Sequence, residues 1–384
     1  MVFSIYIVII IGFLLRIFVA VWNGFFGPSP GADLDAIGLH GFASNVAQTG
    51  ILDEFTIGYI PYTNLLGLIY NFTTSHIFIG SIFSCLAWLT SAHILYKIFI
   101  IFGTNKNQTR VALLLYSLIP STVLFTAITI REPYQLLFVN IAIYSIARII
   151  LNSKSLYYIL LFFSIFCFGV LHGALLAFGI LLASGVLITH KLENKNTIFS
   201  AGFIFTSIII VSILWLGLSI FSNLAYNIDS GLDSSIQAYQ QALLGVDART
   251  NYKSEIPILS LSDLIFFIPA GLFQYLFEPL PWRVSTTSDV ILFFENILRF
   301  FLIWKAFKLP YIEDLKKRRF SKFMLISYFL IEVIWSVGTI NWGTSVRHHL
   351  PAYGFLLLAA FTSTKVNISN IQLKTLVSAR NSIS

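Results

Sequence analysis

Charge is scarce in this sequence. Of its 384 residues only 11% are Asp, Glu, Lys or Arg, whereas 57% are hydrophobic and the mean hydropathy is +0.82. A soluble domain usually needs about a quarter of its residues charged to cover its surface. The shortage of charge therefore argues against a soluble protein and predicts an integral membrane protein.

Cysteine and the common nucleotide and hydrolase motifs are also missing or rare. Cys85 and Cys167 each lie in the middle of an apolar segment, which argues against a disulfide framework. We expect them to be small side chains facing lipid or core. There is no P-loop, no G-x-S-x-G and no G-x-G-x-x-G motif. ATP-driven and serine-hydrolase chemistries therefore have no support.

Long apolar runs dominate the chain instead. A membrane-spanning helix needs about 20 apolar residues. The first run, 3–22, lacks the basic start and cleavage site of a signal peptide, so we expect an uncleaved first span. The long run 156–189 is expected to form two spans that turn at His172. The remaining expected spans are 77–101, 111–129, 133–150, 198–220, 288–307, 322–340 and 350–364.

Two further apolar pieces, 57–72 and 262–278, decide the topology. If neither crosses the membrane, the chain has ten spans with both termini inside. Sixteen Lys and Arg then lie in inner segments and five in outer loops. Because basic residues stay on the cytoplasmic side, we predict that both pieces are re-entrant or interfacial helices. Backbone of that kind needs protein or a water-filled cavity beside it.

The predicted fold is an all-α polytopic membrane protein with about ten transmembrane helices. Residues 1–384 are expected to form a single integral membrane domain, with a first outer loop with interfacial helices over 23–76 and a large outer loop over 221–287. The net charge of +7 would suit nucleic acid. Since most basic residues lie in short loops between apolar runs, nucleic acid is not an expected partner.

The outer side of this topology collects the reactive polar residues, beginning with two acids in the first loop. Asp33 stands where a helix N-cap belongs. Asp35 lies in the first helical turn, where the helix dipole stabilises a carboxylate. Asp35 is a candidate catalytic residue, the alternative being a solvated acid favoured by the dipole. His40, roughly on the Asp33 face, is a candidate substrate ligand or a polar packing residue.

Cations on the same side form a second group of candidates. Arg131 suits bidentate contact with phosphate, and Glu132 is placed to orient it. The alternative is that the two simply start a helix. Arg347 and His348 are candidate phosphate ligands or an interfacial anchor. Further candidate substrate ligands are Arg249 and Arg283.

This layout resembles the GT-C superfamily of membrane glycosyltransferases. The segment Ala32–Ala43 is similar to the family's first-loop pattern, an Asp followed by an apolar or aromatic residue four positions later and an Ala eight positions later. Asp35, Leu39 and Ala43 fill those positions. By this resemblance Asp35 rather than Asp33 takes the catalytic place, although Asp-x-Asp stands where the family usually has Asp-Glu or a single Asp. Shorter similarities to bacterial members occur at 130–132, 279–282 and 347–351.

The resemblance implies transfer of a sugar from a polyprenyl-phosphate or polyprenyl-diphosphate carrier to a glycan or lipid acceptor. The site would face the periplasm or exterior of a bacterial cytoplasmic membrane. Asp35 would take the proton of the acceptor hydroxyl, while Arg131, Arg347 and Arg249 would neutralise the departing phosphate. The pieces 57–72 and 262–278 would wall the cavity for the carrier's tail. Some members need a divalent metal and others do not, so no cofactor is firmly implied.

Two other functions fit the same sequence. An oligosaccharide repeat-unit polymerase uses similar lipid-linked substrates and differs in making a ladder of products. A transporter or flippase for a lipid-linked or anionic solute would carry charges near the membrane midplane. Arg16, Glu295 and Glu332 lie inside expected spans and keep this alternative open. Glu295 is spaced to pair with Arg299 on the same helix, whereas Arg16 and Glu332 are expected to pair across helices or to reach the interface.

Overall fold

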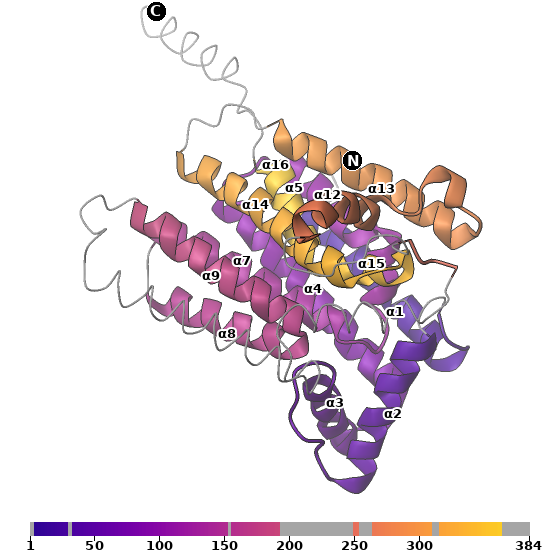
Figure 1. Cartoon of the computed structure of the whole chain (residues 1–384). Coiled ribbons are helices and arrows are strands. Elements are labelled where there is room, and N and C mark those ends of the chain that lie inside the picture. The colour runs from indigo at the N-terminus through magenta and orange to yellow at the C-terminus, as the bar shows by residue number, and fades with distance from the viewer. Residues whose placement is uncertain are drawn as a thin grey trace, which may run out of the picture.

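The computed structural model describes residues 4–29, 33–152, 155–192, 249–252, 263–308 and 315–362. In this part of the chain the regular elements are helices, with one isolated bridge between Asn251 and Asn341 (Figure 1). Within these ranges four helices are long and apolar enough to cross a membrane: α1 (Ile5–Phe25), α4 (Ile77–Ile101), α7 (Glu132–Asn152) and α14 (Leu315–Gly338). Their length and composition indicate an integral membrane protein.

The other described helices are shorter or less apolar. They are α2 (Asp33–Thr49), α3 (Ile60–Phe72), α5 (Lys106–Leu118), α6 (Pro120–Phe125), α8 (Ser155–Leu171), α9 (Gly173–Leu192), α12 (Asp263–Phe277), α13 (Thr287–Phe307), α15 (Trp342–His348) and α16 (Tyr353–Phe361). Two 3-10 turns cover Pro281–Arg283 and Leu350–Ala352.

The all-helical class is confirmed for the described residues, but the ten spans are not. The predicted hairpin at His172 is present, since α8 ends at Leu171 and α9 begins at Gly173. The described parts of α3 and α12 have lengths of roughly 20 and 22 Å at 1.5 Å per residue, short of a hydrocarbon core about 30 Å thick. Their re-entrant or interfacial placement stays a prediction. The expected span 198–220 lies outside the described residues.

The last expected span, 350–364, is a short core helix in the structure. All nine residues of α16 are buried, and the helix packs against α5, α13 and α14. A helix that is hydrophobic on every side belongs inside a bundle. The apolar run that predicted a span is therefore buried among other helices in the structure.

The expected span 111–129 is not one continuous helix, because Pro120 divides it. Helix α5 ends at Leu118 and α6 begins at Pro120. Proline has no N–H to donate to the preceding turn, so carbonyls at the end of α5 need other donors. The Tyr116 carbonyl accepts from Thr122 Oγ1 at 3.4 Å, and the Ser117 carbonyl accepts from Arg16 Nη1 at 2.9 Å.

Arg16 and Glu295, two charged residues inside expected spans, both form hydrogen bonds with backbone groups at this helix break. Arg16 is fully buried, donates from Nε to Thr126 Oγ1 at 2.6 Å, and lies 3.5 Å from the centre of the Trp88 ring. Glu295 Oε1 accepts from the backbone N–H of Ser121 at 2.8 Å. Arg16 therefore binds neutral oxygens at the break.

Replacing Arg16 by methionine should destabilise the protein by about 2–4 kcal/mol, because the Ser117 carbonyl and the Thr126 hydroxyl lose a buried donor. Thermal unfolding of the purified protein in micelles measures the change. Leu15→Met, which alters an exposed residue of the same helix, is the matched control. Equal unfolding midpoints for the two variants would contradict this role of Arg16.

Basic residues and the candidate polar residues lie at opposite ends of the bundle. Helix α14 begins with the run Lys316–Arg319 and ends at Gly338, close to α15. Helix α7 runs the other way, from Glu132 towards Arg148. A methyl group on Gly103, just after α4, would lie 3.5 Å from Lys317 Nζ, so the basic ends of α4 and α14 meet.

Candidate functional site

An ion pair between Asp35 and Arg347 lies at the centre of the candidate site. Nη1 of Arg347 donates to Oδ2 of Asp35, although the two residues are 312 positions apart. Asp35 lies in the first turn of α2 with its side chain 51% exposed, and Arg347 in α15 with its side chain 18% exposed. The sequence predicted both as site residues, and the structure brings them into contact.

Arg131 and Glu132 stand at the start of α7 beside this pair. Burial opposes the charge of Arg347, but nearby Glu132 and Asp35 outweigh it and raise the pKa of Arg347. A methyl group on Gly58 would lie 3.8 Å from Nη1 of Arg131. The loop before α3 is therefore next to Arg131, and a backbone bond from Gly58 N–H to the Val170 carbonyl, 2.9 Å, holds that loop against α8.

Two histidines and a tryptophan complete the arrangement. The His348 ring stacks on Trp335 with a centroid separation of 3.9 Å, and its Nδ1 lies 2.8 Å from Thr339 Oγ1. The His172 ring lies 4.5 Å from Trp335 and 6.0 Å from His348. We call Asp35, Arg131, Glu132, His172, Arg347 and His348 the Arg347 cluster.

Both imidazoles of the Arg347 cluster are neutral at pH 7. Burial lowers the pKa of His172 and of His348 well below the ordinary value, and the charge of Arg131 lowers both further. The positive charge of the cluster therefore belongs to Arg131 and Arg347. Two arginines beside a half-exposed carboxylate can hold an anionic phosphate next to a proton acceptor.

His172 and Trp335 were not among the site residues predicted from the sequence. His172 was read only as a turn residue, although the expected topology put it on the outer side. Trp335 lies within the apolar run of α14, where an aromatic residue gives no signal of a site. His172 and Trp335 are placed in the site only by their contacts with residues distant in the sequence.

Unlike Asp35, the other two predicted site residues of α2, His40 and Asp33, have no described contact with Arg347. His40 Nδ1 lies 2.9 Å from the Tyr70 hydroxyl, so it joins α2 to α3. On a helix it is about 140° around the axis from Asp35. Helix α2 does begin at Asp33, but that side chain lies outside the described residues. Substrate binding by His40 and catalysis by Asp33 stay predictions.

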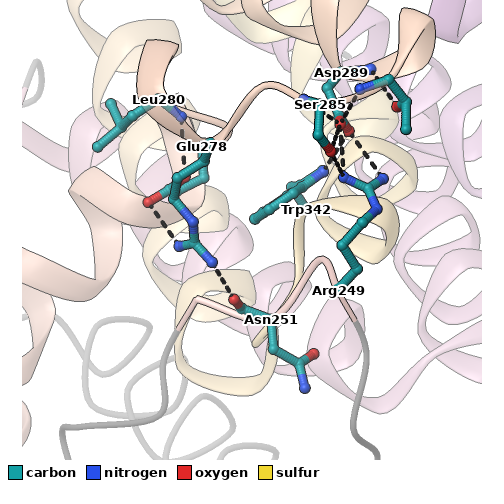
Figure 2. Close-up of polar contacts among 9 residues, drawn as sticks. Arg249, Asn251, Glu278, Leu280, Ser285, Asp289 and Trp342 are labelled. Carbon is teal, nitrogen blue, oxygen red and sulfur yellow. Dashed lines mark hydrogen bonds and ion pairs between the residues drawn. The ribbon is translucent and has the colours of Figure 1, made fainter.

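Arg249 belongs to a second polar group, built around Trp342 (Figure 2). Its Nη1 lies 2.6 Å from Asp289 Oδ2, and Asp289 Oδ1 accepts from the Trp342 indole N–H at 3.0 Å. Asp289 also closes a capping box with Thr286 at the start of α13. These contacts tie the segment 249–252 to α13 and to the beginning of α15.

Arg283 lies on the other side of Trp342. Its Nη1 is 3.2 Å from Glu278 Oε1, and its guanidinium carbon is 4.8 Å from the centre of the Trp342 ring. Figure 2 shows the Trp342 side chain between Glu278 and Asp289, the acids of the two ion pairs. Trp342 opens the same short helix that carries Arg347, so this clamp of two ion pairs holds α15. Direct substrate binding by Arg249 and Arg283 stays a prediction.

Glu332 forms a cross-element pair, one of the two arrangements expected for it. Its Oε2 lies 2.9 Å from His349 Nδ1, and both side chains are fully buried. The Tyr275 ring packs 4.4 Å from His349. Because His349 points to Glu332 and His348 to Trp335, the two adjacent histidines face different surroundings.

The described residues do not favour a divalent metal in the Arg347 cluster. No group of three His, Cys, Asp or Glu within the described ranges is placed to hold a metal ion. The acids of the cluster also lie beside two arginines, whose charge opposes a bound cation. We therefore derive no chemical step through a metal.

Comparison of the chain with protein-family models, with curated proteins and with solved structures finds no match. The class that fold and site define is thus a helical membrane protein. It carries a cluster of two arginines, two acids and two neutral histidines at the end of the bundle opposite its basic residues.

Proposed function

We propose that this protein is a membrane glycosyltransferase that moves a sugar from a polyprenyl-phosphate or polyprenyl-diphosphate carrier to a glycan or lipid acceptor. One observation carries the proposal: the contact of Asp35 with Arg347, next to Arg131. A donor with an anionic head and an apolar tail needs cations at the end of an apolar bundle. The proposal places this end at the periplasmic or outer face of a bacterial cytoplasmic membrane.

The reaction needs only groups that the cluster contains. The acceptor hydroxyl attacks the anomeric carbon of the donor, and its proton passes to the Asp35 carboxylate. The bond from the anomeric carbon to the phosphate oxygen breaks, and the oxygen leaves with the electron pair. Arg131 and Arg347 stabilise the charge that grows on the departing phosphate.

The ion pair of the free protein fits this scheme. While Arg347 holds Asp35, the guanidinium occupies Oδ2 of the carboxylate, so that oxygen is not free to take the proton of the acceptor. A donor phosphate competes for Arg347 and releases Asp35. Binding of the donor would therefore also prepare the base.

The contacts of the site bear differently on the two alternative functions, polymerisation and transport. A repeat-unit polymerase would use the same phosphate and hydroxyl chemistry, so the Arg347 cluster serves either reading. Transport loses much of its support, because Arg16 and Glu295 satisfy backbone groups at the helix break. Glu332, the third charge that suggested a pathway near the membrane midplane, pairs with His349.

A strain lacking the gene tests the proposal, complemented with wild type or with an Asp35 variant. Glycolipids extracted with organic solvent and surface glycans are separated by size. We expect a polyprenyl-linked sugar or a shortened glycan to accumulate in the deletion strain and in the variant. A single missing sugar favours one transfer, and loss of a whole ladder favours polymerisation. A variant that behaves as wild type while the deletion does not would bring transport forward.

A further inference from the structure

Three buried polar atoms near the Arg347 cluster have no hydrogen-bond partner among the described residues. They are Oε2 of Glu132, Nε2 of Gln135 and the hydroxyl oxygen of Tyr62. The three residues are 6%, 1% and 2% exposed. A buried polar atom without a partner costs about 1–3 kcal/mol. Native proteins keep few of them, and each calls for an explanation.

The three residues lie where α3 meets the first turn of α7. Glu132 and Gln135 are three positions apart in the first turn of α7, so they share a face of that helix. Tyr62 comes from α3, and its ring lies 5.4 Å from Tyr134 in the same turn of α7. Burial mainly raises the pKa of Tyr62, and the nearby Glu132 carboxylate adds to the shift.

The chemistry of these atoms favours a ligand rich in hydroxyl groups. A carboxylate accepts hydrogen bonds, an amide nitrogen donates, and a phenol does both. Each hydroxyl of a sugar can donate and accept in the same way. A phosphate would be repelled by Glu132 and is better placed at Arg131 and Arg347. An isoprenoid tail would leave all three atoms without partners.

We propose that Glu132, Gln135 and Tyr62 form a binding site for a sugar ring, next to the phosphate site at Arg131 and Arg347. This inference rests on the proposed function and adds to it the group that is recognised. Glu132 accepts from one sugar hydroxyl, while Gln135 and Tyr62 donate to others. The sugar is thereby held beside Asp35.

Binding of small probes by saturation-transfer NMR tests the site. The protein is placed in lipid nanodiscs, because common detergents carry sugar head groups. Methyl glucoside and methyl N-acetylglucosaminide probe the sugar site, and phenyl phosphate probes the phosphate site separately. The variants are Gln135→Met and Glu132→Gln, with Gln48→Met, at an exposed position of α2, as the control.

We expect Gln135→Met to lower the sugar signal about fivefold, as loss of one hydrogen bond near 1 kcal/mol predicts. Its phenyl phosphate signal should not change. Its unfolding midpoint should equal or exceed that of wild type, since an amide without a partner has been replaced by an apolar chain of similar size. A glutamine needed only for the fold would lower the midpoint instead.

Three results separate the possible failures. If folded Gln135→Met and Glu132→Gln both keep the wild-type sugar signal, water alone satisfies these atoms and the sugar site is overturned. If wild type binds phenyl phosphate but neither sugar, the sugar site is also overturned, while the phosphate site stands. If wild type binds sugar but not phenyl phosphate, the proposed function fails and the sugar site remains.

Discussion

Replacing Asp35 by asparagine should reduce sugar transfer by about 10²–10⁴-fold, the range expected when a general base is removed. Asparagine keeps the size of the side chain but has no carboxylate to take the proton. The measurement is the rate of glycan formation by the purified protein with a polyprenyl-phosphate sugar. The same preparation should show normal yield and a normal unfolding midpoint.

The fold should survive because the ion pair that is lost is partly exposed. Asp35 is half exposed, and ion pairs of this kind contribute about 0–1 kcal/mol. Asp33→Asn is the matched control, two positions away in the same helical turn. If Asp33→Asn abolishes transfer and Asp35→Asn does not, the base has been assigned to the wrong acid of the pair.

Replacing Arg347 by lysine should lower the turnover rate by about 10²-fold, even though the charge is kept. A guanidinium presents a flat pair of N–H donors to two phosphate oxygens, whereas an ammonium is a single point of charge. Loss of one such donor to a developing anion costs about 10²–10³-fold in turnover. Steady-state kinetics with varied donor concentration measures the effect.

The position of Arg347 also predicts which kinetic constant changes. Since its charge acts on the phosphate as it departs, kcat should fall more than KM rises. Arg318→Lys, at the basic end of α14, is the control for the chemical change itself. An unchanged kcat in Arg347→Lys would leave Arg347 a structural partner of Asp35.

Much of the helix pattern could be read from apolar periodicity and length. The first span, the helices at 77–101 and 133–150, and the hairpin at His172 all appear in the structure with ends shifted by a few residues. Runs of this kind are reliable because a helix must satisfy its own backbone in an apolar surrounding. The two pieces that the charge count placed as re-entrant or interfacial, 57–72 and 262–278, contain the helices α3 and α12.

Two apolar runs differ in the structure from the continuous helices that were expected. The run 111–129 is divided by Pro120 and is buried on one side only, since Val111, Leu114 and Leu118 are exposed. The run 350–364 is apolar because α16 lies inside the bundle. Hydropathy reports that a residue avoids water, but it does not distinguish lipid from protein as the neighbour.

For the candidate site, too, local sequence predicted some features and tertiary structure decided others. Local sequence placed Asp35 in a first helical turn and Arg131-Glu132 at a helix start, because capping and dipole effects act within one turn. It also suggested that basic and reactive residues lie on opposite sides, since that follows from counting charges. These features depend on neighbours in the chain.

Only the tertiary structure decided which of these residues meet. Asp35 pairs with Arg347, Arg249 and Arg283 hold Trp342, and Arg16 serves the break at Pro120. Such pairings depend on how helices distant in sequence pack, and a cation of given type gives no local sign of its partner. The sequence by itself determined a helical membrane protein with reactive residues at one end, and packing selected the members of the site.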